Sequence, residues 1–323
     1  MAGDAHENGS ADAIRDRADA DPVLRLAASR ELDAVRRFSH EAMATVFEVY
    51  ALHPDGQYAA QAAQAAFELV DRLERELSRF KSNSDVTRIN HLAAGESTAV
   101  NPSTLECLLI ARHVFDLTGG AFDISIGTGL PTLEIDAEQV RVRAERAGVR
   151  IDLGGIGKGY AVDLMGELLE DWGLELALVH GGFSSVLALE APPEREGWPL
   201  TLSDPSAPAR VLTRLAVRHT ALGASGIRKK DHIVNPRTGQ PVRGRLASWV
   251  AVPRPDATQG APAGQGQRLA PTAIADALTT AFMLLGTEEI ALLCESSPGL
   301  EAWILAEPDG SGGEARLMYF GRQ

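Results

Sequence analysis

The sequence contains little cysteine and no apolar run of membrane-spanning length. Its two cysteines, Cys107 and Cys294, both lie in apolar patterns typical of helices. We therefore expect two buried free thiols rather than a disulfide framework or a cysteine-based metal site. No stretch reaches the roughly 20 apolar residues that a transmembrane helix needs. Residues 1–30 are polar and charged, without the apolar segment of an export signal, and this predicts a cytoplasmic protein.

Positive charge is also scarce. The chain has 31 lysines and arginines against 44 aspartates and glutamates, which gives a formal net charge of −13. Nucleic acids and anionic membranes are bound through basic surfaces, so the composition argues against both as partners. The length of 323 residues allows one large or two ordinary domains, and an apolar content of 45% is ample for a core.

What the sequence does have is a glycine-rich stretch, Arg150-Ile-Asp-Leu-Gly-Gly-Ile-Gly-Lys-Gly-Tyr-Ala-Val-Asp163. Apolar residues recur after it with helical spacing as far as Gly173. A glycine-rich turn at a helix start can present backbone N–H groups to a phosphate, and Lys158 adds a mobile positive charge. The stretch is neither a Walker A loop nor a dinucleotide fingerprint, because Asp152 and Tyr160 stand where those motifs need glycine. From the residues alone, it is either a phosphate-binding turn or a plain tight turn.

A second candidate site lies in the apolar segment Ala273–Leu285, which predicts a buried helix. Asp276 and Thr280 are four residues apart and share one helix face, with Thr279 beside them. A buried carboxylate is costly unless it is paired or bound to a cation. A carboxylate, a hydroxyl and a backbone carbonyl are hard oxygen ligands that suit Mg²⁺. On spacing alone, the alternative that Asp276 caps or bridges a neighbouring segment is equally open.

The third polar cluster is His232-Ile-Val-Asn-Pro-Arg-Thr-Gly239. Asn235-Pro236 predicts a turn and Gly239 permits its exit, which holds a histidine at the end of a short strand. Histidine is the side chain best matched to proton transfer near neutral pH. A lone histidine is more often structural, but the fixed loop favours a functional role.

Hydrophobic periodicity predicts the remaining elements. Helices are expected over Tyr58–Phe80 and from Pro102 to Leu117, with Asn101 as cap. Strands are expected over 45–52, 121–126, 176–179, 185–189, 200–203, 212–219, 247–252, 300–306 and 317–320. Residues 1–37 are expected to form a flexible N-terminal segment with a short helix around Pro22–Val35. Residues 253–271, rich in Pro, Gly, Gln and Ala, are expected to form a flexible loop.

Taken in order along the chain, these clusters resemble the ApbE family of FAD:protein FMN transferases, from about Phe38 to Phe320. The resemblance is carried by Met43-Ala-Thr-Val-Phe-Glu-Val, Leu77-Ser-Arg-Phe-Lys-Ser-Asn-Ser-Asp-Val-Thr-Arg-Ile-Asn90, Gly120-Ala-Phe-Asp123, the stretch Asp152–Asp163, Ser225-Gly226, His232–Gly239 and Ala275-Asp-Ala-Leu-Thr-Thr-Ala281. It implies a single α+β domain over residues 38–323, with mixed β-sheets and packed helices. It also implies a magnesium-dependent transferase that cleaves FAD and attaches FMN through a phosphoester bond to a threonine of a target flavoprotein, releasing AMP.

The resemblance also assigns roles to residues. The FAD site would be lined by Met43, Phe80, Ala121, Phe122, Asp123, Asp152, Lys158 and Val234. The backbone carbonyl of Gly155 would bind Mg²⁺ together with Asp276 and Thr280, with Thr279 adjacent. His232 would be the base that takes the proton of the acceptor threonine, a poor nucleophile until it is deprotonated.

The chain departs from the family pattern at several positions. Residues 124–151 form a shorter segment than usual, Phe80 stands where tyrosine is common, and Asn235 replaces a frequent aspartate. His180-Gly-Gly-Phe-Ser-Ser185 stands where an acidic residue often follows the glycines. Two alternatives to the transferase therefore stay open. One is an FAD pyrophosphatase that gives FMN and AMP with water as acceptor, and the other is a flavin-binding protein without turnover.

Overall fold

The computed structural model describes residues 24–26, 34–226, 234–236, 238–254, 270–308 and 314–321. Its helices are α2 (Gly56–Leu77), α3 (Asp85–Ile89), α4 (Pro102–Leu117), α5 (Gly157–Asp171), α6 (Pro271–Phe282) and α7 (Thr287–Ser296), with a 3₁₀ turn at Leu130–Thr132. Its strands are β1 (Leu24–Leu26), β2 (Arg36–Ala42), β3 (Thr45–Ala51), β4 (Ser97–Ala99), β5 (Leu133–Asp136), β6 (Arg141–Ala144), β7 (Ala177–Gly181), β8 (Ser185–Ala188), β9 (Trp198–Asp204), β10 (Ala207–Val217), β11 (Thr220–Gly226), β12 (Arg245–Pro253), β13 (Glu301–Ala306) and β14 (Arg316–Phe320). Within these ranges, no helix has both the length and the apolar content that a membrane crossing requires.

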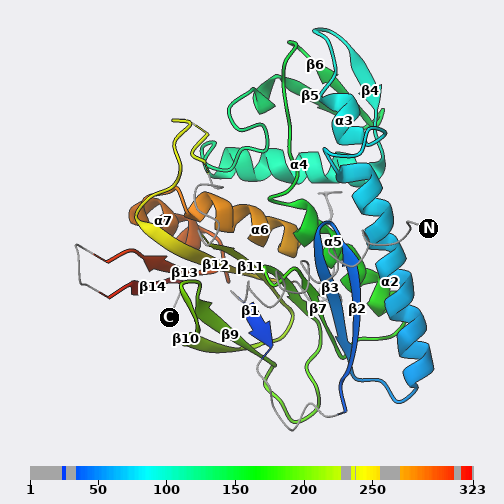
Figure 1. Cartoon of the computed structure of the whole chain (residues 1–323), viewed down its shortest axis with the longest axis vertical. Coiled ribbons are helices and arrows are strands. Elements are labelled where there is room, and N and C mark those ends of the chain that lie inside the picture. The colour runs from blue at the N-terminus through cyan, green and yellow to red at the C-terminus, as the bar shows by residue number, and fades with distance from the viewer. Residues whose placement is uncertain are drawn as a thin grey trace, which may run out of the picture.

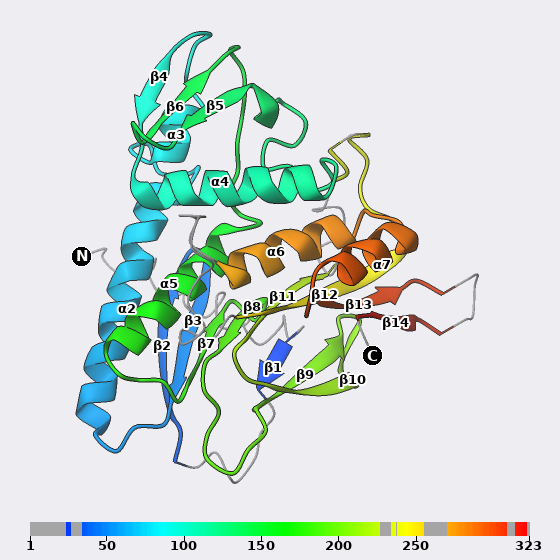
Figure 2. The same ribbon diagram turned by 180° about the vertical axis from the view of Figure 1, so that it is seen from behind.

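The main body of the fold is an eight-stranded sheet with helices on one face (Figure 1). Its strand order is β14-β13-β12-β11-β8-β7-β3-β2, and neighbouring strands run antiparallel. Helix α5 packs on β7 and β8, and α6 packs beside it on β11 and β12. Helix α2 flanks α5, and α4 crosses over α6 (Figure 2). The predicted α+β class with packed helices is confirmed.

The central strands are buried on both faces, which explains their nearly continuous apolar sequences. Alternate residues of β8 enter different cores: Leu187 faces the helices, whereas Val186 and Ala188 face away from them. The opposite face is covered by a three-stranded sheet in the order β1-β9-β10. Trp198 of β9 and Trp249 of β12 are fully buried in the core between the two sheets. The helices and the site are therefore supported from below by a second apolar layer.

A third sheet, β4-β6-β5, lies at one end of the molecule beside α3 and α4 (Figure 1). The short segment 124–151, noted as a departure from the family pattern, supplies its hairpin β5–β6. Two predictions in this part of the chain are wrong. Residues 121–126 form turns rather than a strand, because the Asp123 carboxylate accepts hydrogen bonds from the backbone N–H groups of Ser125 and Gly127 at 2.8 Å each. Asn101 precedes α4 without capping it, because its side chain bonds to the Asp85 carboxylate instead.

The expected flexible segments fall partly outside the described residues. Of the segment 1–37, Leu24–Leu26 is a strand paired with β9, not the expected helix, and β2 already begins at Arg36. Of the segment 253–271, residues 255–269 lie outside the described part, while Pro253 ends β12 and Pro271 begins α6. The prediction of two buried free thiols is confirmed at Cys107 and Cys294.

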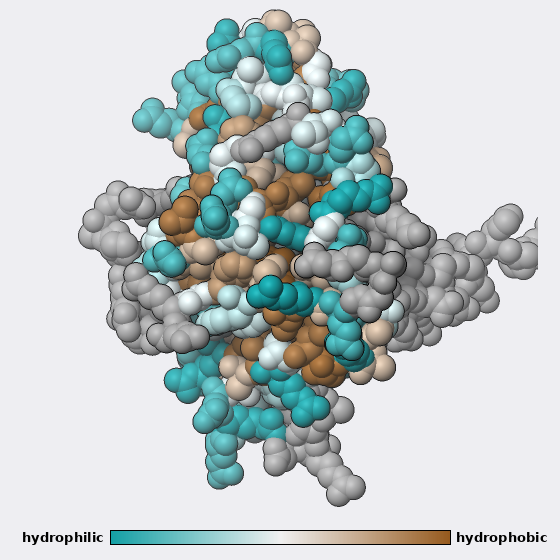
Figure 3. Space-filling view, turned by 90° about the vertical axis from the view of Figure 1, so that its left-hand side faces the viewer, coloured by the Kyte–Doolittle hydropathy of each residue, from teal (hydrophilic) through white to brown (hydrophobic). Residues whose placement is uncertain are grey.

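The surface is divided by polarity. On the side where α7 and β14 lie in Figure 1, apolar residues gather in a central belt between more polar upper and lower ends (Figure 3).

Candidate functional site

A cavity of about 510 Å³ brings the predicted clusters together. One side of it, here called the helical wall, consists of the turn Asp152–Lys158 at the start of α5 and the Asp276–Thr280 face of α6. The other side, the loop wall, consists of residues 43–45, 121–126, 182–184 and 234–236. Of the predicted site residues, the cavity is lined by Met43, Ala121, Phe122, Asp123, Asp152, Gly155, Lys158, Val234, Asp276, Thr279 and Thr280. Phe80 is not among the lining residues, and His232 lies outside the described residues.

The glycine-rich turn is held from below by Asn90. Its side-chain amide donates to the carbonyl oxygen of Ile151 at 3.0 Å, and its amide oxygen accepts from the Ile151 N–H at 2.7 Å. Asp152 then turns the chain by accepting from the Gly154 N–H at 2.9 Å. Lys158, in the first turn of α5, directs its ammonium group to within 3.4 Å of the Gly154 carbonyl oxygen. The turn is therefore preformed, with a lysine at its mouth.

Asp276 is the buried centre of the helical wall, with 5% of its surface exposed. Its Oδ2 accepts from the backbone N–H of Gly159 at 2.8 Å, so it satisfies one of the free N–H groups at the start of α5. The Ser185 hydroxyl, from β8, lies 2.8 Å from both carboxylate oxygens. Burial raises the pKa of Asp276 to about 6, although Lys158 and these two hydrogen bonds act in the opposite direction. The carboxylate is thus available in its charged form at neutral pH.

Both threonines stand one turn beyond Asp276. Thr279 is fully buried, donates its hydroxyl to the Asp276 carbonyl at 2.7 Å, and lies 2.9 Å from the Ser225 hydroxyl of β11. The Thr280 hydroxyl is less engaged, at 3.5 Å from the same carbonyl. Gly155 lies opposite it, since a Cβ at Gly155 would be 3.8 Å from the Thr280 hydroxyl. Carboxylate, hydroxyl and turn therefore lie side by side in the helical wall.

These oxygen atoms fit a hard divalent cation. Among the described residues no group of three or more His, Cys, Asp and Glu side chains could hold a metal, so an ion here would have one carboxylate and neutral oxygens as protein ligands. That is the donor set expected for Mg²⁺, which keeps waters and shares its remaining positions with substrate phosphates. The Oδ1 atom of Asp276 has the Ser185 hydroxyl as its only hydrogen-bond partner in the described part of the chain, and a carboxylate oxygen can take two.

The loop wall is built from tight turns. Met43 and Ala44, at the β2–β3 hairpin, have φ of 51° and 56°, and Phe183, at the β7–β8 hairpin, has 57°. Ile126 has φ of 48° in the turn organised by Asp123. Non-glycine residues rarely adopt this left-handed region, and such strain often marks functional sites. Of the seven such residues in the described chain, these four line the cavity, so the strain is concentrated at its rim.

Phe80 lies near the rim without lining the cavity. Its side chain is 83% exposed, and the Arg79 guanidinium lies over its ring at 4.6 Å from the centroid. Arg79 in turn pairs with Asp152, with 3.1 Å between Nε and Oδ2. The aromatic ring is therefore linked to the glycine-rich turn through one arginine.

Sequence reasoning assigned no role to Ser185, Ser225 and Arg79. Ser225 lines the cavity and Ser185 bonds to Asp276 because β8 and β11 pair beside α6, which is a tertiary arrangement that no local pattern reveals. Arg79 lies in an alternating run of acidic and basic residues typical of a solvated helix face. Its position directly before Phe80 was the one available signal.

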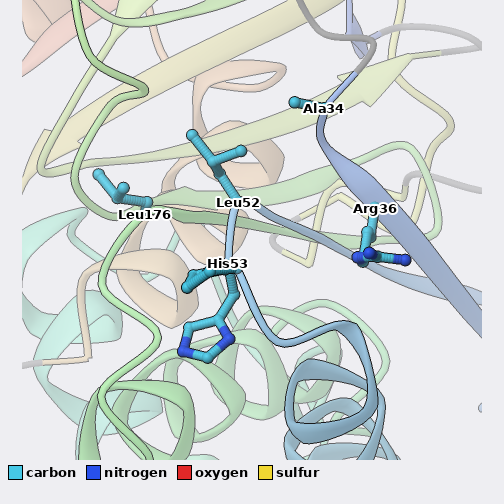
Figure 4. A pocket seen from close by; sticks show the side chains of 6 residues that line it. Ala34, Arg36, Leu52, His53 and Leu176 are labelled. Carbon is cyan, nitrogen blue, oxygen red and sulfur yellow. The ribbon is translucent and has the colours of Figure 1, made fainter.

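A second hollow, of about 650 Å³, lies far from these residues in the fold (Figure 4). It is lined by Ala34, Arg36, Leu52, His53, Pro54 and Leu176. The guanidinium of Arg36 lies against Gly56 at the start of α2, and the His53 ring bonds to the Asp55 backbone. Its polar groups are therefore occupied by local contacts and do not converge on a common point.

Comparison with known proteins gives a consistent result. The model of the ApbE family matches residues 43–131 and 128–304. A protein of Treponema pallidum named FAD:protein FMN transferase is 27% identical over 79% of this chain and 79% of its own length. One of Vibrio cholerae with the same name is 22% identical over 83% of this chain and 86% of its own length.

Solved structures share the fold. The flavin transferase ApbE from Vibrio cholerae superposes with a TM-score of 0.72 at 18% identity, covering 88% of this chain and 97% of that one. The ApbE protein from Thermotoga maritima gives a TM-score of 0.72 at 22% identity, with 87% and 96% covered. At these identities the superpositions establish the architecture.

Proposed function

This chain belongs to the ApbE family, and we propose that it is an FAD:protein FMN transferase that binds FAD in the cavity between the helical wall and the loop wall. The reaction would attach FMN through a phosphoester bond to a threonine of an acceptor flavoprotein and release AMP. The relatives' names support the activity. Dependence on Mg²⁺ and threonine as the acceptor residue are our proposals for this chain.

One observation carries the proposal: the glycine-rich turn of α5 and the oxygen face of α6 lie side by side and line one cavity. Phosphoryl transfer requires mainly positioning and neutralisation of charge. Lys158 and the backbone N–H groups of the turn would bind the pyrophosphate of FAD. Asp276, Thr280 and the Gly155 carbonyl would hold Mg²⁺, with Thr279 supporting them. Bound there, the ion would neutralise the phosphate oxygens and orient them.

The remaining predicted residues would bind the rest of FAD. Met43, Ala121, Phe122, Asp123 and Val234 supply the apolar and turn-forming surface of the loop wall, and Phe80 would stack on a flavin or adenine ring at the rim. Asp152 would accept a hydrogen bond from the ribose or a base. Arg79 already occupies one Asp152 oxygen, so ligand binding at Asp152 requires the other oxygen or displacement of the arginine.

His232 would act as the base. The threonine Oγ attacks the FMN phosphorus, its proton passes to the imidazole, and the bond to the AMP phosphate oxygen breaks. Val234 and Pro236, which follow His232 closely in sequence, line the cavity and support this assignment.

We predict that His232→Ala lowers FMN transfer by on the order of a hundredfold or more, a usual size for loss of a general base. FAD affinity, measured by calorimetry, should change much less; equal losses of binding and transfer would mean that His232 only shapes the pocket.

The test of function is incubation of the protein with FAD, Mg²⁺ and a folded acceptor domain that carries a target threonine. Mass spectrometry of the acceptor should show addition of FMN, and chromatography should show AMP in equal amount. Release of FMN and AMP without acceptor labelling would favour the pyrophosphatase. FAD binding without any product would favour a flavin-binding protein.

A pair of variants, one at the proposed metal ligand and one control, tests the metal site. Asp276→Asn keeps the size of the side chain but removes its charge, and transfer should fall at least a thousandfold if Asp276 holds the ion. Asp171→Asn, an exposed change at the end of the same α5 helix, should leave transfer unaltered. Undiminished transfer by Asp276→Asn, or by the wild-type protein in excess chelator, would exclude the metal assignment.

A cytoplasmic location stays a prediction from the polar composition of residues 1–30.

A further inference from the structure

Helices α5 and α6 cap each other's N-terminal ends. Asp276 of α6 accepts from the Gly159 N–H of α5 at 2.8 Å. In return, Asp163 of α5 accepts from the N–H groups of Thr272 and Ala273 at 2.9 Å each, one on each carboxylate oxygen. Both carboxylates are buried, with 5% and 3% exposed. Each helix thus carries the carboxylate that accepts hydrogen bonds from the free N–H groups at the start of the other helix.

The start of α6 has no cap of its own. Ala270 stands at the N-cap position without a side-chain hydrogen bond, and Pro271 follows it. The first free N–H groups of α6, at Thr272 and Ala273, therefore have Asp163 as their acceptor. A carboxylate also interacts favourably with the positive end of the helix dipole.

The contact fixes α6 in both rotation and translation. Gly159, one turn before Asp163 on α5, approaches α6 so closely that a Cβ there would overlap the Thr272 carbonyl oxygen and lie 2.7 Å from its carbon. Asp276 stands one turn after Thr272 on α6. A shift of α6 along or around its axis would therefore break the two Asp163 bonds and move Asp276 away from Gly159 together.

We propose that Asp163 is a positioning residue, which holds the oxygen ligands of α6 in register with the glycine-rich turn of α5. The inference rests on the metal site proposed above, and it gives Asp163 a role without contact to substrate or ion. Outer residues that orient metal ligands usually change metal affinity by about 10- to 100-fold when they are replaced.

The test is Mn²⁺ binding to the full chain at pH 8, followed by electron paramagnetic resonance without FAD or acceptor. Asp163→Asn keeps the shape of the side chain but turns an amide NH₂ toward one N–H of α6, so the helix must move. We expect its Kd for Mn²⁺ to rise at least tenfold. The matched control is Asp55→Ala, because Asp55 caps α2 at the same two positions, through the N–H groups of Gln57 and Tyr58. Its Kd should equal that of the wild type.

The outcomes separate the inference from the function on which it rests. A wild-type chain that binds no Mn²⁺ would overturn both. A wild-type chain that binds Mn²⁺ and an Asp163→Asn variant with the same Kd would overturn the positioning role alone, and any change in melting temperature would then reflect a purely structural cap. If Asp163→Asn does not fold, Asp163→Ser takes its place, since its hydroxyl can still accept from one N–H, and the same criterion of a tenfold change applies.

Discussion

The helical wall and the loop wall of the cavity are built in opposite ways. In the helical wall, the functional oxygens are buried and cross-linked by hydrogen bonds between α5, α6, β8 and β11. In the loop wall, four non-glycine residues hold left-handed backbone conformations at exposed or half-buried turns. Electrostatic stabilisation needs groups that are fixed before the reaction. Recognition of a large flat ligand tolerates, and often uses, surface turns that adapt.

The proposed groups for chemistry and those for ligand recognition therefore come from different parts of this fold. The groups proposed for metal and phosphate binding come from helix ends packed on the large sheet. The groups proposed for the flavin and adenine rings come from hairpin tips and turns. Substitutions in the helical wall should therefore act on turnover and stability together, whereas those in the loop wall should act on ligand affinity alone.

Outside the proposed ligand and base residues, the largest effect is expected where the two helices touch. Gly159→Ala places a methyl group into the Thr272 carbonyl, so α6 must shift. A displacement of about 1 Å at a catalytic group can cost on the order of a hundredfold in rate, and overpacking costs about 1–3 kcal/mol of stability. We expect transfer to fall about a hundredfold and the melting temperature to fall by several degrees.

The control lies two residues away in the same motif. A Cβ at Gly157 would meet nothing closer than the Leu77 side chain, at 3.9 Å. Gly157→Ala should therefore keep the wild-type melting temperature or raise it slightly, because alanine favours the helix by roughly 1 kcal/mol over glycine. Equal damage from both substitutions would mean that the glycines serve the turn as a whole and not the contact between helices.

A smaller effect is expected at Phe80, beside the cavity. Phe80→Ala removes an aromatic ring that is 83% exposed and free to stack a ligand ring on the face away from Arg79. Stacking on an aromatic side chain contributes about 1–3 kcal/mol, so FAD affinity, measured by flavin fluorescence, should weaken about tenfold. Melting temperature should not change. The control is Leu292→Ala, another exposed apolar residue, on α7; unchanged affinity in Phe80→Ala would remove Phe80 from the site.

The sequence predicts the helical wall much better than the loop wall. Helix periodicity, the four-residue spacing of Asp276 and Thr280, and the glycine cluster are local signals, and all of them appear where expected in the fold. The spacing alone left two roles open for Asp276, as a metal ligand or as a cap, and the structure shows that it caps α5. The same carboxylate keeps an oxygen that fits the ion.

The loop wall depends on contacts between distant segments. Residues 121–126 have the composition of a strand, but the Asp123 carboxylate takes two backbone N–H groups and closes a turn. A Cβ at Gly127 would lie 2.7 Å from the Pro236 carbonyl oxygen, so this turn also depends on a segment more than a hundred residues away. Such geometry follows from the assembled sheet, and local propensity does not encode it.

A separate effect is expected on the pH dependence of stability, and it tests how deeply the helical wall is buried. Burial raises the pKa of Asp163 from 3.8 to about 7, against the hydrogen bonds from Thr272 and Ala273. Between these values the folded chain binds a proton that the unfolded chain releases. The contribution of Asp163 to the free energy of unfolding is therefore highest at low pH, and it is lost as the pH rises to about 7.

Asp163→Asn should remove this dependence. Between pH 5 and 8 the wild type should lose on the order of 2 kcal/mol more stability than the variant, because each unit of pKa shift corresponds to about 1.4 kcal/mol. The titratable groups that interact with Asp163 are Asp276 on α6, the Cys107 thiol on α4 and Arg254 after β12, and all three remain in both proteins. Melting curves of the two proteins, recorded without metal or FAD, give the difference directly. A difference that stays constant with pH would mean that Asp163 is charged throughout, held by the N-terminal end of α6 more strongly than burial opposes it.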